Sequence, residues 1–520
     1  MTRTTPHHPS LSRDPADLIA GQWTPLASSG APAIESHNPA RPGEILWRGE
    51  PRAEHVDRAV HAARDAFKVW SRWPKEERAA VLRTLAKLFN DNIDRITALL
   101  RDEVGKPTWD ARGEAQILAG KIDITLDDGP MSRVAGFEAP LGPTKAGRCW
   151  FRPHGVMGVV GPFNFPAHLP NGHVVPALAM GNTVVIKPSD KTPGVGQLMG
   201  ELYHQALAQH NAPPGVVNVV QGGSEIASRL TRHPHIDGIL FTGSWPVGRR
   251  ILEANLDHPG RIIALEMGGN NAAVIMPGAD LAQAVVECVR CAFISSGQRC
   301  TCTRRVIVHE SIADRVISAI CKAASNLIVG DPAAEHPVFM GPLISEQARD
   351  AVLAAQSAMA RAGASVLVQS TRMDRDGWFC TPSVVQVDGF STATDLAQDP
   401  GADFEVFGPL LRVCIARDFE HALELANASN YGLAASIFSR DPDAVDDFLR
   451  LARAGCVNVN TGTAGASSKL PFGGLGFSGN HRPAGAFSLD YCAYPVAGMI
   501  ESGSASTISP GMRFEPDWVA

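Results

Sequence analysis

Four cysteines near the middle of the chain have the types and spacing that most directly suggest chemistry. Cys288, Cys291, Cys300 and Cys302 follow the pattern C-x2-C-x8-C-x-C. Thiolates act both as nucleophiles and as zinc ligands, so the cluster fits either an enzyme or a metal site. Cys288 and Cys291 lie on a smooth apolar helical pattern, "LAQAVVECVRCAF", which favours buried thiols. Cys300 follows the Gly-containing break "SSGQ", and we expect its side chain to point away from Cys302.

Several polar residues follow apolar runs that are typical of strands. These are Asn164 in "GPFNFP", Lys187 and Asp190 in "IKPSD", Glu266 in "LEMGG" and Glu405 in "FEVFGP". Taken singly, each could be an ordinary loop residue. Glu266 is harder to dismiss because it ends the apolar run "IIALE". Burial raises the pKa of a carboxyl group toward the range that a general base needs.

Two glycine-containing loops suggest nucleotide binding to different degrees. "GSWPVG" (243–248) follows a strand-like run and precedes a helical pattern. A helix N-terminus of this kind can bind a pyrophosphate. Ser at that position is also a common helix cap, so both interpretations remain open. "GLGFSG" (474–479) matches G-x-G-x-x-G but lacks the flanking strand and helix, which favours a tight loop.

The elements that must position these residues fall into two series. Helical periodicity dominates residues 56–120, and after about residue 150 short β-branched runs alternate with helical ones. A further strand series follows the cysteines, so the pattern predicts two α/β domains. Ligands of such folds bind at the carboxyl ends of the strands. Segments 147–156 and 487–496 look extended and would pair with each other or with another subunit.

The bulk composition restricts the class of protein. The chain has 520 residues, 44% of them hydrophobic and 19% charged, and its formal net charge is −6. This balance predicts a globular protein of two or three domains with no nucleic-acid partner. The apolar stretch 173–188 is interrupted by Pro176, Asn182 and Lys187, so we expect no membrane span. The polar N-terminus carries no secretory pattern, which makes the cytoplasm the expected location.

The ordered set of motifs resembles the aldehyde dehydrogenase superfamily over almost the whole chain. The matching stretches are "GPFNFP", "VVIKPSD", "FTGS", "LEMGGNN", "FISSGQRC", "EVFGPLL", "NYGLAASIFS" and "PFGGLGFSG". The resemblance implies an α/β fold with two parallel, Rossmann-type sheets and a small β oligomerisation arm. The implied divisions are a polar leader over 1–17, an NAD-binding domain over 18–140 and 157–267, a catalytic domain over 268–480, and an arm with a tail over 141–156 and 481–520.

The resemblance also assigns roles to individual residues. It implies that Cys300 is the nucleophile, Glu266 the general base and Asn164 a donor to the oxyanion. Residues implied to bind the cofactor are Lys187, Ser189, Asp190, Gly243, Ser244, Gly248, Glu405 and Phe407. An acid at Asp190 favours NAD, with NADP possible, because a carboxylate can accept from the ribose 2′-OH. Trp245 is bulky where the family usually has a small residue, and the sequence does not decide its effect.

Closer features, such as "GQRCTCTRR" and "SGNHRP", resemble a branch of the family that oxidises an acidic semialdehyde with two carboxylates. Arg299 is then the first candidate to bind a carboxylate, followed by Arg482 and His481. One alternative is an aldehyde dehydrogenase for another substrate, such as succinic semialdehyde or an aliphatic or aromatic aldehyde. The other is a zinc-binding protein that uses the four cysteines. The family also implies a homodimer or homotetramer.

Overall fold

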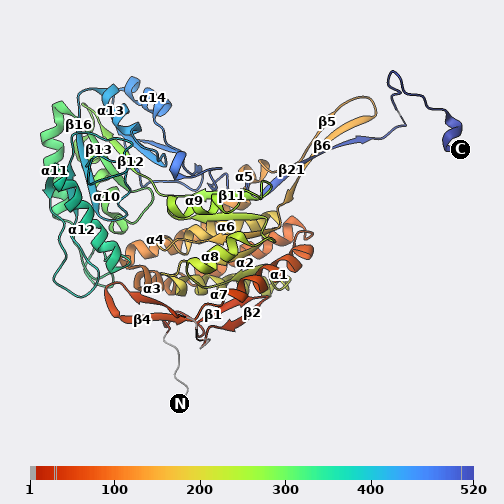
Figure 1. Ribbon diagram of the computed structural model, residues 1–520, viewed down its shortest axis with the longest axis horizontal. Helices are drawn as coiled ribbons and strands as arrows, with labels where there is room; N and C mark the ends of the chain where they lie inside the picture. The colour runs from red at the N-terminus through yellow and green to blue at the C-terminus, as the bar shows by residue number, and fades with distance from the viewer. Residues whose placement is uncertain (1–6, 28–29, 31, 505) are drawn as a thin grey trace, which may run out of the picture.

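A computed structural model describes residues 7–27, 30, 32–504 and 506–520 of the chain. Two seven-stranded sheets, each covered by helices, make up the body of this described part. A three-stranded sheet projects from the body and leads to the C-terminus (Figure 1). The α/β fold expected from the sequence is therefore confirmed.

The first sheet combines parallel strands with an antiparallel edge. Its spatial order is β11 (Ile262–Glu266), β10 (Gly238–Thr242), β7 (Val156–Val160), β8 (Thr183–Lys187), β9 (Val217–Val219), β1 (Ala16–Ile19) and β2 (Gln22–Pro25). Strands from β11 to β9 run parallel. Strands β7, β8 and β10 are buried throughout, as parallel strands covered on both faces must be.

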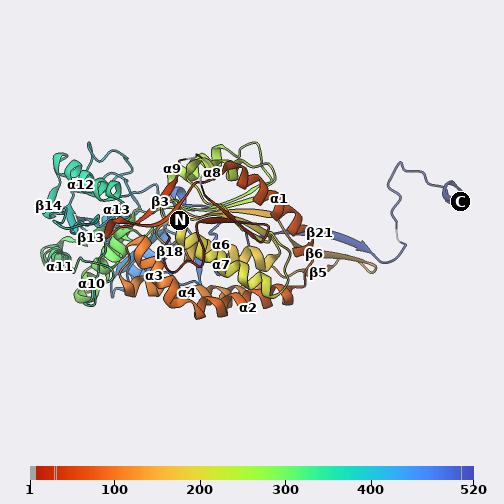
Figure 2. The same cartoon turned by 90° about the horizontal axis from the view of Figure 1, so that it is seen from below.

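Helices cover both faces of this sheet (Figure 2). One face carries α1 (Ala53–Trp70), α8 (Ser224–Arg232) and α9 (Trp245–Glu253). The other carries α2 (Lys75–Asp91), α3 (Ile93–Val104), α4 (Thr108–Leu126), α6 (His168–Met180) and α7 (Pro193–Gln209). Helix α5 (Asp128–Ser132) follows α4, and β3 (Ile34–Asn38) pairs with β4 (Arg41–Gly49) beside the sheet. The helices predicted over 56–120 are confirmed.

The second sheet is parallel except at one edge. Its order is β14 (Ser365–Val368), β15 (Ser383–Gln386), β16 (Leu410–Ala416), β13 (Thr303–His309), β12 (Asn271–Ile275), β17 (Ala434–Phe438) and β18 (Cys456–Val459). Strand β14 alone in this sheet is antiparallel to its neighbour. Helices α12 (Glu346–Arg361), α13 (Phe419–Asn427) and α14 (Pro442–Leu451) pack on one face, and α10 (Leu281–Phe293) and α11 (Ala313–Ser325) on the other.

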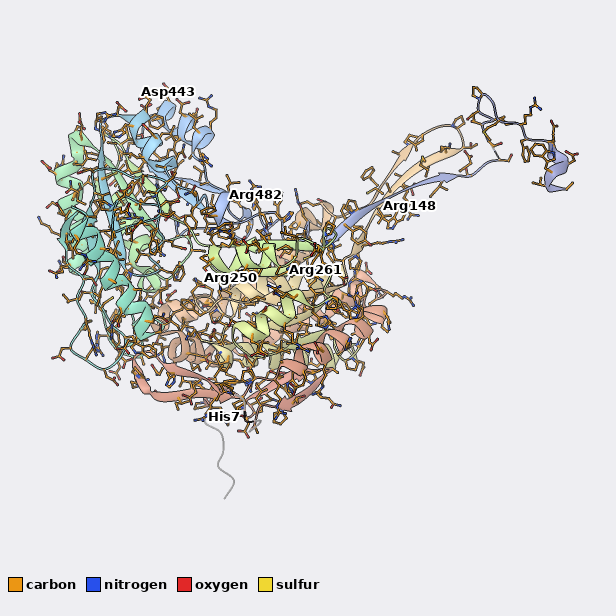
Figure 3. The ribbon with its side chains drawn as sticks, viewed as in Figure 1. His7, Arg148, Arg250, Arg261, Asp443 and Arg482 are labelled. Carbon is orange, nitrogen blue, oxygen red and sulfur yellow. The ribbon has the colours of Figure 1, made fainter. Side chains whose placement is uncertain are left out.

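The projecting arm consists of β5 (Phe137–Pro140), β6 (Lys145–Pro153) and β21 (Ala493–Glu501). Strand β6 pairs antiparallel with β21 along its whole length, so the expected pairing of the two extended segments is confirmed. Arg148 marks this arm in Figure 3. Strand β5 precedes residue 141, where the sequence placed the start of the arm. The short strands β19 (Pro471–Phe472) and β20 (Ala484–Gly485) form a separate pair in the body.

Part of the polar leader that the sequence predicted over residues 1–17 packs against the first domain. Residues 1–6 lie outside the described part, but residues 7–17 pack against the first domain. His8 Nε2 lies 3.0 Å from Asp102 Oδ2, and Leu11 is buried in the core. Strand β1 then pairs with β9 through Leu18 and Val219. Among the described residues, every helix is too short or too polar to cross a membrane.

Arg305 on β13 joins the segment that follows Glu266 to the second sheet. Its buried guanidinium donates from Nε to Asn270 O (2.7 Å) and from its other nitrogens to carbonyl oxygens at the end of α13, those of Leu425, Ala426 and Ala428. Arginine can reach these acceptors because its donors form a planar fork. This one side chain therefore fixes the connection between the two sheets close to Glu266 at the end of β11.

We expect Arg305→Lys to destabilise the fold without removing the charge. Lysine cannot reach all four carbonyls, and each buried polar group left unpaired costs about 1–3 kcal/mol, so the free energy of unfolding should fall by about 3 kcal/mol. Urea denaturation followed by circular dichroism measures the change. Arg315→Lys, at an exposed position on α11, is the control and should alter stability by less than about 0.5 kcal/mol. Equal stability of the two variants would contradict this role of Arg305.

Candidate active site

A left-handed turn after α10 sets the position of Cys300. Ser295, Ser296 and Gly297 have φ values of +52°, +55° and +73°. Gly297 is required there, since a Cβ atom would lie 2.1 Å from Gly408 O. The Asn271 side chain then donates from Nδ2 to Cys300 O (2.7 Å) and to Cys302 O (2.8 Å). These contacts fix the backbone on both sides of the short segment between the two cysteines.

The four cysteines have different environments. Cys302 is fully buried and directs its Sγ toward Ile294 O, whereas Cys300 is half-buried and lines two cavities. Cys288 and Cys291 are buried on α10, as their helical pattern predicted. Within the described ranges, no three His, Cys, Asp or Glu side chains are arranged so that they could hold a metal ion. The zinc alternative therefore finds no ligand set in this part of the chain.

Glu266 lies at the carboxyl end of β11, where it lines the same two cavities as Cys300. Pairing with β10 and the bond from Gly243 N to Glu266 O (3.0 Å) fix its backbone. The loop that contains Gly479 bridges to it from the other side. The carboxyl group is buried, and its Oε1 has no hydrogen-bond partner among the described residues. Burial therefore raises the pKa of Glu266 well above its ordinary value.

Asn164 follows β7 and lines the larger of the two cavities together with Cys300 and Glu266. It is buried, and its Nδ2 donates to Gln298 O, 2.9 Å away, on the segment before Cys300. A side-chain amide carries two N–H donors, so one remains for a second acceptor. The structure thus brings together the three residues that the sequence named as nucleophile, base and oxyanion donor.

The electrostatic environment of Cys300 keeps its thiol protonated. Burial raises the pKa of Cys300, and the negative charges of Glu266 and Glu405 raise it further, while Arg304 lowers it. Because the thiolate is the reactive form, attack by Cys300 requires a group that accepts its proton. Glu266, whose own pKa is raised and whose oxygen is unpartnered, is a suitable acceptor in the same cavity wall.

The larger cavity has a volume of about 860 Å³, within the range of small-molecule sites. It contains most of the residues that the sequence assigned to a cofactor: Lys187, Ser189, Asp190, Gly243, Ser244, Glu405 and Phe407. Gly248 does not line it, and instead packs against Met267, whose Sδ would lie 2.3 Å from an added Cβ. Ser244 is the N-cap residue of α9 but makes no side-chain capping bond. The backbone amides there are therefore not satisfied by that hydroxyl.

Backbone groups hold two side chains, those of Lys187 and Glu405, in the wall of this cavity. Lys187 Nζ donates to Gly222 O (2.9 Å), and burial lowers the pKa of Lys187 to about 8. Glu405 Oε1 accepts from Gly269 N (3.1 Å). Gly268 is needed beside it, because a Cβ atom would lie 1.8 Å from Glu405 Oε2. The carboxylate of Glu405 is thus held in the cavity wall by a backbone that only glycine permits.

Trp245 forms part of an aromatic wall of the larger cavity. Its ring stacks on Phe477 with centroids 4.3 Å apart and planes 9° apart, and Tyr431 meets Phe477 edge-on. Trp245 begins α9, whereas Phe477 belongs to the loop 474–479. The bulky residue that departs from the family pattern is therefore packed against the opposite wall of the cavity.

A smaller cavity of about 180 Å³ shares Cys300, Glu266, Leu169 and Thr242 with the larger one. Arg299 lines it, as expected for a substrate residue, but donates to Asp110 Oδ1 (2.6 Å). Two other substrate candidates do not line either of these cavities.

His481 and Arg482 are these two candidates. Both have positive φ, and both side chains are exposed; Figure 3 shows Arg482 at the surface of the molecule. Sequence reasoning missed Lys121, which lines the smaller cavity from α4. It also missed Asn271, whose amide holds the backbone of both cysteines. Asn271 ends the motif "LEMGGNN", which could have drawn attention to it, whereas Lys121 belongs to no quoted motif and is brought to the site by the packing of α4.

Comparisons with known proteins agree with this geometry. A family model described as the aldehyde dehydrogenase family matches residues 23–495. The chain belongs to the aldehyde dehydrogenase family. An N-succinylglutamate 5-semialdehyde dehydrogenase of Sphingopyxis alaskensis is 41% identical, covering 91% of this chain and 95% of that protein. One of Paraburkholderia xenovorans is 40% identical over 96% and 99%.

Solved structures show the same architecture. A 1-pyrroline-5-carboxylate dehydrogenase from Thermus, solved with bound NAD, superposes with a TM-score of 0.85 at 28% identity, covering 96% of this chain and 93% of that one. The fold of this aldehyde dehydrogenase is therefore shared with a protein that was solved with a bound nicotinamide cofactor.

Substitution of the two neighbouring thiols separates their roles in this aldehyde dehydrogenase. Cys300→Ser should lower kcat by at least about 1000-fold, since loss of a nucleophile removes the covalent route. Cys302→Ser is the matched control and should retain most activity, because its thiol is buried away from both cavities. Aldehyde-dependent reduction of the nicotinamide cofactor, followed by absorbance, measures both. Loss of activity in Cys302→Ser with activity retained in Cys300→Ser would reverse the assignment.

Proposed function

We propose that this aldehyde dehydrogenase oxidises N-succinylglutamate 5-semialdehyde to N-succinylglutamate with NAD. The observation that carries the proposal is the identity of about 40% to dehydrogenases of that name over more than nine-tenths of the chain. The smaller cavity supports it, because cationic side chains line it next to Cys300. A substrate with two carboxylates matches such a wall in charge.

The first step assigned to this chain is attack by Cys300 on the aldehyde carbon. Glu266 accepts the thiol proton, a C–S bond forms, and the electron pair of the carbonyl bond moves to oxygen. The free N–H of Asn164 and the backbone N–H of Cys300 stabilise that oxyanion. A donor of this kind contributes roughly 3 kcal/mol in other enzymes. A bound nicotinamide would supply the hydride acceptor, and as the oxyanion re-forms the carbonyl bond and the substrate carbon loses a hydride, a thioester would remain on Cys300.

Glu266 also serves the second half of the reaction. Glu266 first releases to solvent the proton it took from Cys300, and as a general base it then removes a proton from water, whose oxygen attacks the thioester carbon. The C–S bond then breaks, the acid is released, and Cys300 recovers its proton. Burial raises the pKa of Glu266, which makes the carboxylate a stronger proton acceptor than an ordinary glutamate in both proton transfers.

The residues proposed to hold NAD line the larger cavity. Lys187, Ser189 and Asp190 follow β8, and Asp190 would accept from a ribose hydroxyl. Ser244 offers its backbone amide at the start of α9 to the pyrophosphate, and Gly243, whose own amide is bonded to Glu266 O, lets the ligand approach the backbone beside it. The second ribose and the nicotinamide are assigned to the residues on the catalytic side, Glu405 and Phe407.

We further propose that the protein is a homodimer or homotetramer that associates through the arm. Strand β21 exposes Met499 and Ile500, and β5 exposes Phe137. Exposed apolar side chains and a projecting sheet edge favour contact with a second copy. We also propose that the chain is divided into an NAD-binding domain, a catalytic domain and an arm, as the sequence predicted.

A panel of aldehydes and cofactors tests the proposed activity. We expect kcat/KM for N-succinylglutamate 5-semialdehyde to exceed that for succinic semialdehyde and for hexanal by at least about tenfold, which corresponds to about 1.4 kcal/mol of binding in the transition state. NAD should be preferred over NADP, because the carboxylate of Asp190 would repel a 2′-phosphate. The rate of NADH or NADPH formation measures both preferences. Higher kcat/KM for the neutral aldehyde would refute the proposed substrate.

A further inference from the structure

The smaller cavity contains a buried ammonium group whose charge has no counterpart. Lys121 lies on α4 and is only 3% exposed. Its Nζ donates to Gly485 O (3.0 Å) and to Ser488 Oγ (2.7 Å), and both acceptors are neutral. Among the described residues, no carboxylate lies within ion-pair distance of it. An ammonium group has three N–H donors, so one remains for a ligand.

The other cations near this cavity are already compensated. Arg299 donates to the buried carboxylate of Asp110 at 2.6 Å. Lys106, whose Nζ lies over the ring of Phe165 in the cavity wall, pairs with Glu114 at 2.5 Å. Both positive charges are therefore balanced within the protein, and Lys121 differs from them in this respect.

The histidines of the cavity do not supply a positive charge either. Burial, together with the charge of Lys121, lowers the pKa of His168 to about 4 and that of His173 to about 3. At neutral pH both imidazoles are uncharged. Lys121 is thus the source of net positive charge on the described wall of the cavity that contains Cys300.

Burial without an anion makes the charged form of Lys121 costly. Burial lowers the pKa of Lys121 to about 8, so the group is largely protonated at pH 7. An anionic ligand that enters the cavity would restore the missing electrostatic partner. Charge-assisted bonds to a carboxylate are stronger than neutral ones, so the energy gained would favour acidic ligands over neutral ligands of the same shape.

We propose that Lys121 binds a carboxylate of the substrate and thereby selects an acidic aldehyde. The contact is a hydrogen-bonded ion pair between Nζ and one carboxylate, placed in the cavity that also contains Cys300 and Glu266. This inference rests on the proposed function, which supplies a substrate with two carboxylates. Arg299 instead pairs with Asp110 and packs on the ring of Phe165. It therefore forms part of the cavity wall and is not the principal anion site.

A structural role for Lys121 makes different predictions. Its bonds to Gly485 and Ser488 join α4 to the segment after β20, so its loss could simply loosen the cavity wall. A loosened wall would impair every substrate to a similar extent. A lost anion contact would instead raise KM for a charged substrate and leave a neutral analogue unaffected.

The Lys121→Met variant tests the proposal with two substrates that share one carbon skeleton and differ in charge. These are N-succinylglutamate 5-semialdehyde and its dimethyl ester, which lacks both negative charges. In the variant we expect KM for the diacid to rise roughly 10- to 100-fold with kcat within about threefold, while kcat/KM for the ester changes by less than about threefold. Lys322→Met, at an exposed position on α11, is the control and should behave as the unsubstituted enzyme. Thermal unfolding of all three proteins shows whether the fold is retained.

The outcomes separate this inference from the proposed function. An equal loss of kcat/KM for diacid and ester in Lys121→Met would assign a structural role and overturn the inference. An unchanged KM for the diacid would overturn it as well. If the unsubstituted enzyme does not prefer the diacid to the ester, the proposed function itself fails, and this result is visible before any variant is measured.

Discussion

The proposed chemistry depends on one buried carboxyl group, that of Glu266, whose Oε1 has no hydrogen-bond partner among the described residues. Burying a charged carboxylate is unfavourable unless it is paired, so the fold shifts Glu266 toward its protonated form. Strand pairing with β10 and the bridge to Gly479 hold the residue in place regardless of that cost. The same carboxyl group raises the pKa of Cys300. Nucleophile and base therefore form a coupled pair whose reactivity the surrounding structure controls.

The architecture explains why two cavities meet at this pair. The carboxyl ends of β7, β8, β10 and β11 form one edge of the first sheet, and ligands of α/β folds bind at such an edge. The left-handed turn after α10 carries Cys300 from the second sheet to the same edge. A cofactor can thus approach from the first domain and an aldehyde from the smaller cavity. Cys300, the proposed nucleophile, lies where the two spaces join.

The sequence predicted the parts of this arrangement that depend on local motifs. The alternation of strands and helices indicated two α/β domains, and Cys300, Glu266 and Asn164 stood in recognisable contexts that the structure brings together. The antiparallel strands β1 and β2 were not foreseen, because short edge strands have little periodicity. His481 and Arg482 were chosen by charge and neighbouring motif. Their exposure depends on a positive-φ turn that the residue types alone do not indicate.

Lys121 shows what a single sequence cannot reveal. In α4 it has the same helical spacing as any surface lysine, and only the packing of α4 against α6 and the segment after β20 buries it. Arg299 was the opposite case, since its position beside the nucleophile suggested a free charge that Asp110 in fact balances. Charge compensation is a property of the tertiary structure. It therefore has to be read from contacts between distant residues.

The most direct test of the account is a rapid-mixing experiment on Glu266→Gln with N-succinylglutamate 5-semialdehyde and NAD. Glutamine has the same shape and no charge, so the fold should be retained. Because Cys300 loses the group that accepts its proton and the thioester loses its general base, we expect slow formation of at most about one NADH per active site, with an acyl group on Cys300 detectable by mass spectrometry. The unsubstituted enzyme should turn over without accumulating that acyl group. Full steady-state turnover by the variant, or the acyl group on another residue, would contradict the account.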